Sequence, residues 1–407
     1  MIGGFVMAGF EPVRRAFEAN FERRRELGAA CVVYHRGAKV VDLWGGYAGS
    51  ERRGPWREDT LVMVYSTSKG LAAMAVALAH SRGWLDYDAT VASYWPEFAQ
   101  NGKDQITVRQ LLSHQAGLCA IDERLDATKL ANLDAVAAAM ARQRPAWNPG
   151  THQGYHALSL GWYESELIRR VDPRHRSLGR LFAEEIADPL GLEFYFGLPG
   201  EIEPDRVASI KGSSRLRALM HARTMPARML TAFLRPSSLT AQVFSNPKLR
   251  GPADLDTPAY RAVEIPAGGG IGGVASIAKA YSEFATGGRQ LGLSAQTLQE
   301  LTALPRPPSA GTRDLVLTVD ASFSLGFARP SGKFQFGVSE RAFGHPGAGG
   351  SFAFADPDSS LGFAYAPNRL GHHLRDDPRE KALRDAVYSC LRTLQGTGIA
   401  NRALTPP

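Results

Sequence analysis

The strand-like segments of this 407-residue chain lie near its two ends, and this distribution limits the folds that it can adopt. Near the start, the runs AACVVYH and AKVVDLWGG flank Arg36-Gly37, which is the pattern of a β-hairpin. Near the end come the β-like runs FSLGFA, SFAFADP and LGFAYAP. The residues between carry helical and loop patterns. We therefore expect an α/β fold of the α+β type, in which one antiparallel sheet is built from both termini and flanked by helices.

The same pattern divides the chain into two expected domains. Residues 1–90 and 265–407 form the predicted α/β domain, with helices over residues 11–27 and 378–394. Residues 91–264 form the predicted second domain, which is mostly helical and inserted over one edge of the sheet.

Composition indicates a soluble globular protein, because 44% of the residues are apolar and 21% are charged. No run of about 18 apolar residues occurs, so we expect no membrane-spanning helix and no stable membrane insertion. The first residues lack the basic and apolar regions of a secretory signal. Cys31, Cys119 and Cys390 lie far apart and are odd in number, which argues against a disulfide framework and favours a reducing cytoplasm.

Charge and histidine spacing restrict the partners that we expect. The formal net charge is +7, but most basic residues are interspersed with acidic ones, whereas nucleic-acid binding needs a clustered basic stripe. The histidines show no metal-ligand spacing, so no metal is expected. The sequence leaves the oligomeric state undetermined.

Three Ser-x-x-Lys motifs occur, and their surroundings distinguish them. They are Ser66–Lys69, Ser245–Lys248 and Ser276–Lys279. Ser245 precedes Asn-Pro, which predicts a loop. Ser276 follows a glycine-rich turn and is expected to cap a helix, with Lys279 simply on that helix. Ser66 lies where the apolar run LVMVY meets an alanine-rich helix that extends through His80.

The Ser66–Lys69 pair has the spacing that nucleophilic catalysis needs. Residues three apart share one face of a helix, so the lysine can take the serine proton. Burial beside the apolar run would lower the pKa of Lys69 and make it a neutral base. The helix N-terminus adds a positive potential for a developing oxyanion. Locally, the alternative of a helix-capping serine and a surface lysine stays open.

Five ordered sequence blocks decide between these alternatives by resemblance. The blocks are VYSTSKG, ITVRQLLSHQAGL, GYHALSLGW, GGGIGGVAS and FGHPGAGGS. Together they resemble the serine hydrolases of the class C β-lactamase and penicillin-binding-protein superfamily, and within it most closely the family VIII carboxylesterases. The resemblance extends from about residue 10 to residue 395 and implies a β-lactamase-like fold.

The resemblance also implies roles for individual residues. Ser66 would be the acylated nucleophile, Lys69 its proton partner, and Tyr155 a phenol that acts as general base and then as general acid. The backbone N–H groups of Ser66 and Ala348 would form the oxyanion hole. The remaining candidate substrate-binding residues are His345, Gly347 and His156.

Two further parts of the pattern are interpreted as structural. Pro346 has no N–H to donate, which suits an edge strand beside a cleft. LLSHQAGL contains Ser113 and His114, yet the resemblance implies a structural helix and turn near the site. The chain has no Gly-x-Ser-x-Gly elbow and no spacing that supports a Ser-His-Asp triad.

Two departures from the β-lactamase pattern favour an esterase. Ala157 replaces the asparagine that would bind the side-chain amide of a β-lactam, and His345 replaces the lysine that would pair with its carboxylate. We therefore expect a cofactor-independent carboxylesterase that hydrolyses short-chain acyl esters through an acyl-enzyme on Ser66. The alternatives are a β-lactamase or D-alanyl peptidase-type amide hydrolase, an acyltransferase, and a penicillin-recognising binding module without turnover.

Residues 211–250 form an unusual basic segment with eight Lys or Arg residues and no Asp or Glu. Its apolar residues include Met220, Met225, Met229 and Phe233. We interpret the segment as a cap over the active-site cleft, because methionine adapts to acyl chains of varied shape. A plain helical insertion and a membrane-surface helix are the alternatives.

Overall fold

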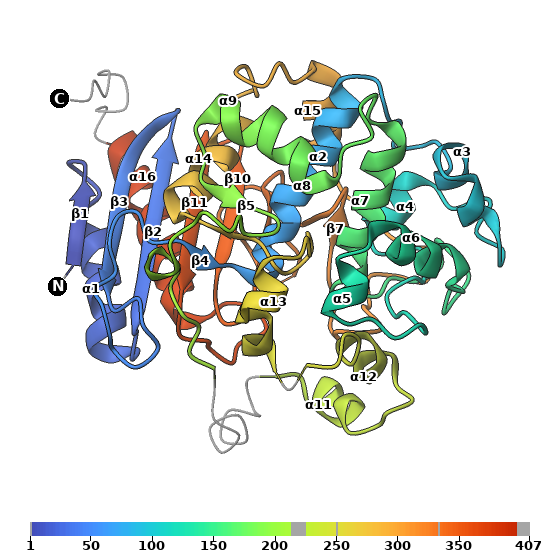
Figure 1. Cartoon of the computed structure of the whole chain (residues 1–407). Helices are drawn as coiled ribbons and strands as arrows, with labels where there is room; N and C mark the ends of the chain where they lie inside the picture. Colours follow the sequence, from blue (N-terminus) through green and yellow to red (C-terminus); the bar gives the residue numbers. More distant parts are fainter. Residues whose placement is uncertain (1, 213–224, 250, 333, 397–407) are drawn as a thin grey trace.

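The computed structural model describes residues 2–212, 225–249, 251–332 and 334–396 (Figure 1). Its main element is an eight-stranded antiparallel sheet in the order β1-β3-β2-β11-β10-β9-β8-β7. The strands are β1 (Ile2–Val6), β2 (Gly28–His35), β3 (Ala38–Gly46), β7 (Phe323–Ser324), β8 (Phe327–Ala328), β9 (Phe343–Pro346), β10 (Phe352–Asp356) and β11 (Leu361–Pro367). Because β2 pairs with β11, both ends of the chain build one sheet, and the predicted fold class is confirmed.

The β2–β3 hairpin forms where the sequence predicted it. Arg36 and Gly37 both have a positive φ, of 54° and 80°. Two consecutive left-handed residues are the requirement of a type I′ turn, whose twist matches that of the flanking strands. The hairpin therefore brings β2 and β3 into register from local sequence alone.

The two faces of the sheet carry different helices. Alternate residues of β2 belong to different hydrophobic clusters, with Ala30 and Val32 in one and Cys31 and Val33 in the other. Helix α14 (Val274–Ala285) covers the first face, and α1 (Glu11–Arg23) and α16 (Pro378–Gly396) pack together on the second (Figure 1).

Helix α2 (Ser68–Ser81) is the central helix of the molecule, and its residues from Ser68 to Ala79 are all buried. It packs against α7 (Ser159–Val171), α8 (Leu178–Phe182), α15 (Ala295–Thr302) and strands β8 and β9. The other helical segments are η1 (Tyr65–Thr67), α3 (Val91–Tyr94), η2 (Pro96–Ala99), α4 (Val108–Leu112), α5 (Ala127–Leu130), α6 (Leu133–Arg142), η3 (Ala183–Ala187), α9 (Asp188–Leu190), η4 (Pro204–Arg206), α11 (Ala227–Phe233), α12 (Leu239–Phe244), η6 (Pro252–Asp256) and α13 (Pro258–Arg261). The division into two domains stays a prediction.

A second, three-stranded sheet joins distant parts of the chain beside α2. It contains β4 (Val62–Met63), β6 (Ile271–Gly272) and β5 (Phe194–Tyr195), in that order. The apolar run before Ser66 therefore pairs with the glycine-rich segment and not with the main sheet.

The structure corrects two local predictions. Helix α14 begins at Val274 with Gly273 as its N-cap, and Ser276 accepts a hydrogen bond from the backbone N–H of Glu193 instead of capping the helix. Strand β9 is not an edge strand, because β10 and β8 flank it. However, β8 pairs with β9 only at Gly344, so the missing N–H of Pro346 breaks no ladder there.

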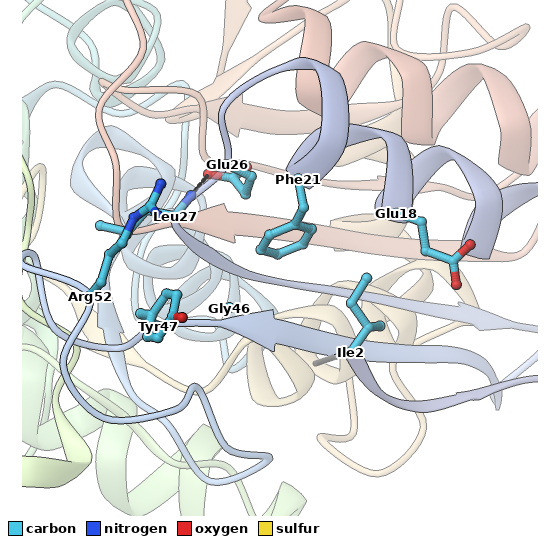
Figure 2. Close-up of a pocket in the computed structure, with 8 residues that line it drawn as sticks. All are labelled: Ile2, Glu18, Phe21, Glu26, Leu27, Gly46, Tyr47 and Arg52. Atoms are coloured by element: carbon cyan, nitrogen blue, oxygen red, sulfur yellow. Dashed lines mark hydrogen bonds between the residues drawn. The ribbon is translucent and has the colours of Figure 1, made fainter.

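A surface groove of about 490 Å³ lies beside α1 and the end of β3 (Figure 2). Phe21, Tyr47, Glu26 and Arg52 contribute to its wall. The carboxylate of Glu26 accepts hydrogen bonds from Leu27, Arg379 and Tyr365. None of the predicted site residues lines this groove, so the candidate site lies elsewhere.

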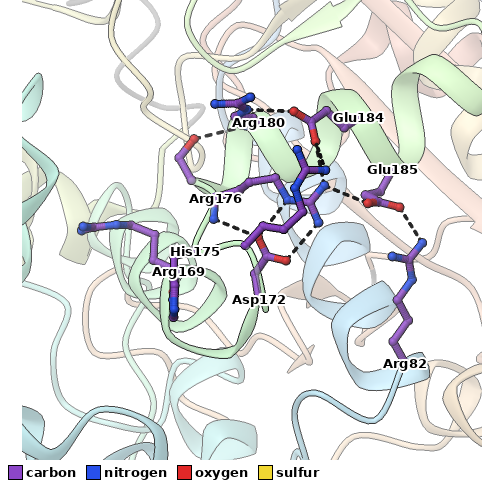
Figure 3. Close-up of polar contacts among 10 residues, drawn as sticks. Arg82, Arg169, Asp172, His175, Arg176, Arg180, Glu184 and Glu185 are labelled. Carbon is purple, nitrogen blue, oxygen red and sulfur yellow. Dashed lines mark hydrogen bonds and ion pairs between the residues drawn. The ribbon is translucent and has the colours of Figure 1, made fainter.

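An ion-pair network holds the C-terminal ends of α7 and α2 (Figure 3). Buried Arg176 donates two hydrogen bonds to Asp172, the C-cap of α7, and pairs with Glu184 and Glu185. Glu185 also accepts from Arg82, the C-cap of α2. Because both helices begin near the predicted catalytic residues, this network fixes their relative placement from the far end.

Candidate active site

The predicted nucleophile Ser66 lies in η1, the turn between β4 and α2. The preceding residue, Tyr65, has a φ of 50°, a left-handed conformation that costs a non-glycine residue about 1–2 kcal/mol. Hydrogen bonds hold this turn: the Ser68 hydroxyl donates to the Tyr65 carbonyl (2.5 Å) and accepts from the Gly270 N–H (3.0 Å). The glycine-rich segment therefore fixes the backbone that presents Ser66.

The end of β9 supports the same turn from its other side. Ser351 donates to the Val64 carbonyl (2.8 Å) and accepts from Thr67 (3.1 Å). A Cβ atom on Gly347 would lie 2.1 Å from Ser351 Oγ and 2.4 Å from the Val64 carbonyl oxygen. Only glycine fits this contact, so the HPG segment lies directly against the nucleophile turn.

Lys69 lies one helical turn after Ser66 and has no exposed surface. Its Nζ atom is 3.3 Å from Ser66 Oγ, 2.5 Å from the Ala157 carbonyl oxygen and 2.7 Å from the Ala267 carbonyl oxygen. Burial lowers the pKa of Lys69 to about 7, while the charge of Glu164 acts in the opposite direction. A neutral amine has two N–H donors and one lone pair. The two carbonyls use the donors, which leaves the lone pair for the Ser66 proton.

Tyr155 completes the group, because its hydroxyl hydrogen bonds to Ser66. Lys69 Nζ lies 4.8 Å from the centre of the Tyr155 ring. Burial raises the pKa of Tyr155 above its usual value, while the Ser66 hydrogen bond lowers it. The phenol therefore keeps its proton at a pH where Lys69 is already neutral, so the lysine is the stronger candidate for the first base.

The loop around Asp314, which sequence reasoning missed, positions Tyr155. The fully buried Asp314 carboxylate accepts hydrogen bonds from the backbone N–H groups of Val316 and Leu317, and the backbone N–H of Tyr155 also stabilises its charge. Burial raises the pKa of Asp314 to about 6, against the effect of these three donors. Gln153 donates its side-chain amide to two carbonyls of the same loop. No motif in the sequence marks Asp314, because its partners are backbone groups.

His156 and His114 belong to the buried framework next to Tyr155. The ring of His156 is fully buried, its Nε2 accepts from the Leu118 N–H, and its Nδ1 donates to the Gly154 carbonyl. The backbone N–H of His156 in turn donates to Nδ1 of His114. A substrate therefore has no free ring nitrogen of His156 to bind, which contradicts its predicted role. The structural role expected for LLSHQAGL agrees with this arrangement.

The HPG segment brings His345 next to Tyr155, with their ring centres 5.8 Å apart. The Nδ1 of His345 donates to the Pro346 carbonyl (2.7 Å), and within the described residues its buried Nε2 has no partner. Burial lowers the pKa of His345 to about 3, and the charge of Lys69 acts in the same direction. His345 is thus a neutral ring with one unused acceptor atom.

The predicted oxyanion hole lies at the edge of this group. Ala348 is exposed, whereas Ser66 lies in the buried turn. Among the described residues, no hydrogen bond between elements uses the backbone N–H of Ser66 or Ala348. The Gly347 N–H, in contrast, donates to the Ser351 carbonyl (2.7 Å).

The other two Ser-x-x-Lys motifs lack this arrangement. Ser245 is the exposed C-cap of α12, and Lys248 is also exposed. Lys279 donates to the Leu190 carbonyl, and Ser276 bonds to Glu193. Within the parts of the chain that the structure describes, no His, Cys, Asp and Glu group is arranged to hold a metal ion.

A half-buried serine that faces a lysine and a tyrosine, beside strand β9 of an antiparallel sheet, defines a serine hydrolase whose base is not histidine. The Beta-lactamase family model matches residues 13–388, and the chain belongs to this family.

Three similar proteins illustrate the range of the family. "Esterase/beta-lactamase LipL" of Mycobacterium tuberculosis is 35% identical over 366 residues, which cover 89% of this chain and 81% of that protein. A crystal structure of a family VIII carboxylesterase is 39% identical, with a TM-score of 0.84 and coverage of 96% of this chain and 100% of that chain. A penicillin-binding-protein homologue from Caulobacter crescentus is 36% identical, with a TM-score of 0.82 and the same coverage.

Proposed function

We propose that this member of the family is a carboxylesterase that hydrolyses short-chain acyl esters through an acyl-enzyme on Ser66. One observation carries the proposal. The buried Lys69 amine has two carbonyl acceptors for its two N–H groups, and its third direction faces Ser66. Two relatives, an esterase/beta-lactamase and a family VIII carboxylesterase, support the substrate class.

In acylation, Ser66 Oγ attacks the ester carbonyl carbon and Lys69 accepts the serine proton. The oxyanion that forms is stabilised by the backbone N–H groups of Ser66 and Ala348. Tyr155 donates its phenolic proton to the leaving alkoxide and recovers a proton from Lys69. In deacylation, water replaces the alcohol, the proton transfers are reversed, and the carboxylic acid leaves. No cofactor takes part in these steps.

His345 and Gly347 are the proposed substrate contacts. The unused Nε2 of His345 can accept one hydrogen bond from the hydroxyl of the leaving alcohol or from the attacking water. Gly347 allows the HPG segment to lie close to the nucleophile turn, which positions the Ala348 N–H for the oxyanion. We do not include His156, because both of its ring nitrogens already have partners.

Steady-state hydrolysis of p-nitrophenyl butyrate between pH 5 and pH 9 tests this function. We expect many turnovers per enzyme molecule, without an acyl-enzyme that accumulates and never clears. Because Lys69 must be neutral to act as a base, kcat/KM should fall as the pH decreases through about 7, the pKa of this lysine. A single stoichiometric burst would indicate the binding module. A kcat/KM that still rises about tenfold per pH unit up to pH 9, as the ordinary lysine pKa of about 10.4 would produce, would exclude a desolvated Lys69 as the base.

A β-lactamase is the second candidate function, since one relative is named as both an esterase and a β-lactamase. Tyr155, Lys69 and Ser66 would serve β-lactam cleavage as well as ester cleavage. The positions that differ are Ala157 and His345, and they decide between the two substrates.

We further propose that helices α11 and α12 form a cap beside the acyl pocket. Thr240 of α12 donates to the Val316 carbonyl, in the loop that positions Tyr155. Asn246 donates to the carbonyls of Ile121 and Glu123 and accepts from Leu125, in the loop after LLSHQAGL. The α11–α12 hairpin is therefore anchored to two segments next to the site.

Only some of the side chains predicted to form the cap face inward. Met229 is buried in the same hydrophobic cluster as Tyr155, and Met225 packs against that cluster. Phe233 is 37% exposed and contacts Phe244, so it does not belong to the inner side. Met220 lies outside the described residues.

A Met225→Ala/Met229→Ala variant should change the acyl chain-length profile. Because these side chains offer apolar surface to longer chains only, we expect acetate hydrolysis within about twofold of wild type and decanoate hydrolysis about tenfold lower. The measurement is kcat/KM on acetate through decanoate esters, with Leu304→Ala at an exposed site as the matched control. An unchanged profile in a stably folded variant would leave a plain helical insertion as the better account.

The three cysteines support a reducing, cytoplasmic location, which we propose for this protein. Cys31, Cys119 and Cys390 are free and buried. Burial raises the pKa of Cys119 to about 12, so its thiol is unreactive. Among the described residues, no helix is long and apolar enough to cross a membrane.

A further inference from the structure

The outward side of the α11–α12 hairpin exposes an apolar surface, here called the outer face. It consists of Leu230, Phe233, Leu234 and Phe244, which are 36%, 37%, 78% and 40% exposed. The described residues expose eight large apolar side chains, and these four are half of them. Single exposed apolar residues need no explanation, but a contiguous group indicates a binding surface.

Helical spacing makes the outer face continuous. Leu230, Phe233 and Leu234 lie at positions i, i+3 and i+4 and so share one side of α11. Phe244 of α12 extends this surface, because its ring centre is 5.4 Å from that of Phe233. Met229, four residues before Phe233, borders this side and is buried. An ordinary surface helix exposes its polar side, whereas α11 buries only the border of its apolar side and exposes the rest.

The hairpin that carries the outer face also carries positive charge. Arg228, Arg235 and Lys248 are exposed, and no described carboxylate lies within ion-pair distance of them. Residues 225–249 contain no Asp or Glu. Apolar side chains flanked by cations match the boundary of an anionic bilayer, where the apolar groups enter the acyl region and the cations meet phosphates.

We propose that the outer face docks onto an anionic phospholipid surface. A second copy of the chain fits less well, because a twofold interface through this face would place three cations against three cations with no acid between them. In Figure 1, α11 and α12 project from one end of the molecule, and none of the helices and strands drawn in colour covers them.

Docking through this hairpin would bring the active site to the lipid boundary. The hairpin is anchored to the loop that positions Tyr155, through the Thr240 hydrogen bond to Val316. An ester dissolved in the bilayer would therefore meet the site at its cap. This consequence rests on the proposed esterase function, whereas the docking does not.

Co-sedimentation of the full chain with lipid vesicles tests the docking. We expect at least about tenfold stronger binding to vesicles of mixed phosphatidylcholine and phosphatidylglycerol than to pure phosphatidylcholine at low salt. The difference should disappear at about 0.5 M salt, because screening removes the charge contribution. Equal binding to both vesicles, or none, would overturn the proposal.

Two double variants separate the contributions of the apolar side chains and of the cations to vesicle binding. Leu230→Ser/Leu234→Ser and Arg228→Gln/Arg235→Gln should each lower binding to anionic vesicles about tenfold or more. The matched controls are Leu304→Ser/Val338→Ser and Arg289→Gln/Arg392→Gln, which change exposed residues elsewhere. Unchanged thermal melting and unchanged hydrolysis of a water-soluble acetate ester would show that the hairpin variants fold.

Two outcomes would contradict the docking surface. Control variants that lose as much binding as the hairpin variants would show nonspecific adsorption of a basic protein. A wild-type dimer that the Leu230→Ser/Leu234→Ser change converts to monomer, in sedimentation velocity, would assign the outer face to a second copy. Loss of vesicle binding with retained esterase turnover leaves the proposed function intact, so the two proposals fail separately.

Discussion

Replacement of Ser66 by alanine is expected to lower kcat on p-nitrophenyl butyrate by about a thousandfold or more. Removal of the hydroxyl leaves no group that can form the acyl-enzyme, although the pocket and the oxyanion donors stay in place. Stopped-flow and steady-state assays on the same preparation would show neither an initial burst nor turnover. Thermal melting should change little, because among the described residues Ser66 Oγ hydrogen bonds only with Lys69 and Tyr155.

Lys69→Ala and Tyr155→Phe should be nearly as severe as the loss of the nucleophile. The three side chains act as one proton-transfer unit, so double variants should be little worse than single ones. Ser276→Ala is the matched control, since it removes a serine from another Ser-x-x-Lys motif and should retain activity. If Ser66→Ala kept more than about a tenth of wild-type activity while Ser276→Ala lost it, the wrong motif has been assigned.

Much of the fold could be predicted because its signals are local. The turn at Arg36-Gly37 needs two left-handed residues, and the alternating strands need only period-two patterning. That both termini contribute to one sheet was inferred from the strands at the two ends of the chain, but the pairing of β2 with β11 was not predicted. The short strands β5 and β6 were missed, because two-residue strands are fixed by tertiary contacts.

The sequence identified some residues of the catalytic site and missed others. Ser66 and Lys69 were found because their spacing is local, and Tyr155 because of a resemblance. Asp314 was missed, since it acts through the backbone N–H of Tyr155, and backbone donors carry no sequence signature. The two backbone carbonyl oxygens that accept hydrogen bonds from Lys69 could not be predicted from the sequence for the same reason.

His156 illustrates the opposite error. It was predicted to contact the substrate, but successive residues on an irregular segment face different surroundings. In the structure, its ring is buried among backbone groups of Leu118 and Gly154. Phe233 was misplaced in a similar way, because an apolar residue predicts burial or a binding surface without telling which.

The second large effect concerns β-lactams: kcat/KM on nitrocefin should be about 100-fold or more below that on p-nitrophenyl acetate. Ala157 offers no side-chain amide, and its carbonyl already accepts from Lys69. His345 is neutral, because burial lowers its pKa to about 3, so it cannot pair with a β-lactam carboxylate. The substrate would lose one neutral and one charge-assisted hydrogen bond, which together account for a factor of this size.

The variants Ala157→Asn and His345→Lys test whether these positions set the preference. Asparagine should raise nitrocefin hydrolysis more than ester hydrolysis, because the added amide can contact only a substrate with a side-chain amide. The lysine variant must also be checked by thermal melting, since a cation replaces a buried neutral ring beside Lys69. Equal wild-type efficiency on nitrocefin and on the acetate ester would show that neither position determines specificity. Acyl transfer by Ser66, Lys69 and Tyr155 would then serve both substrates without discrimination.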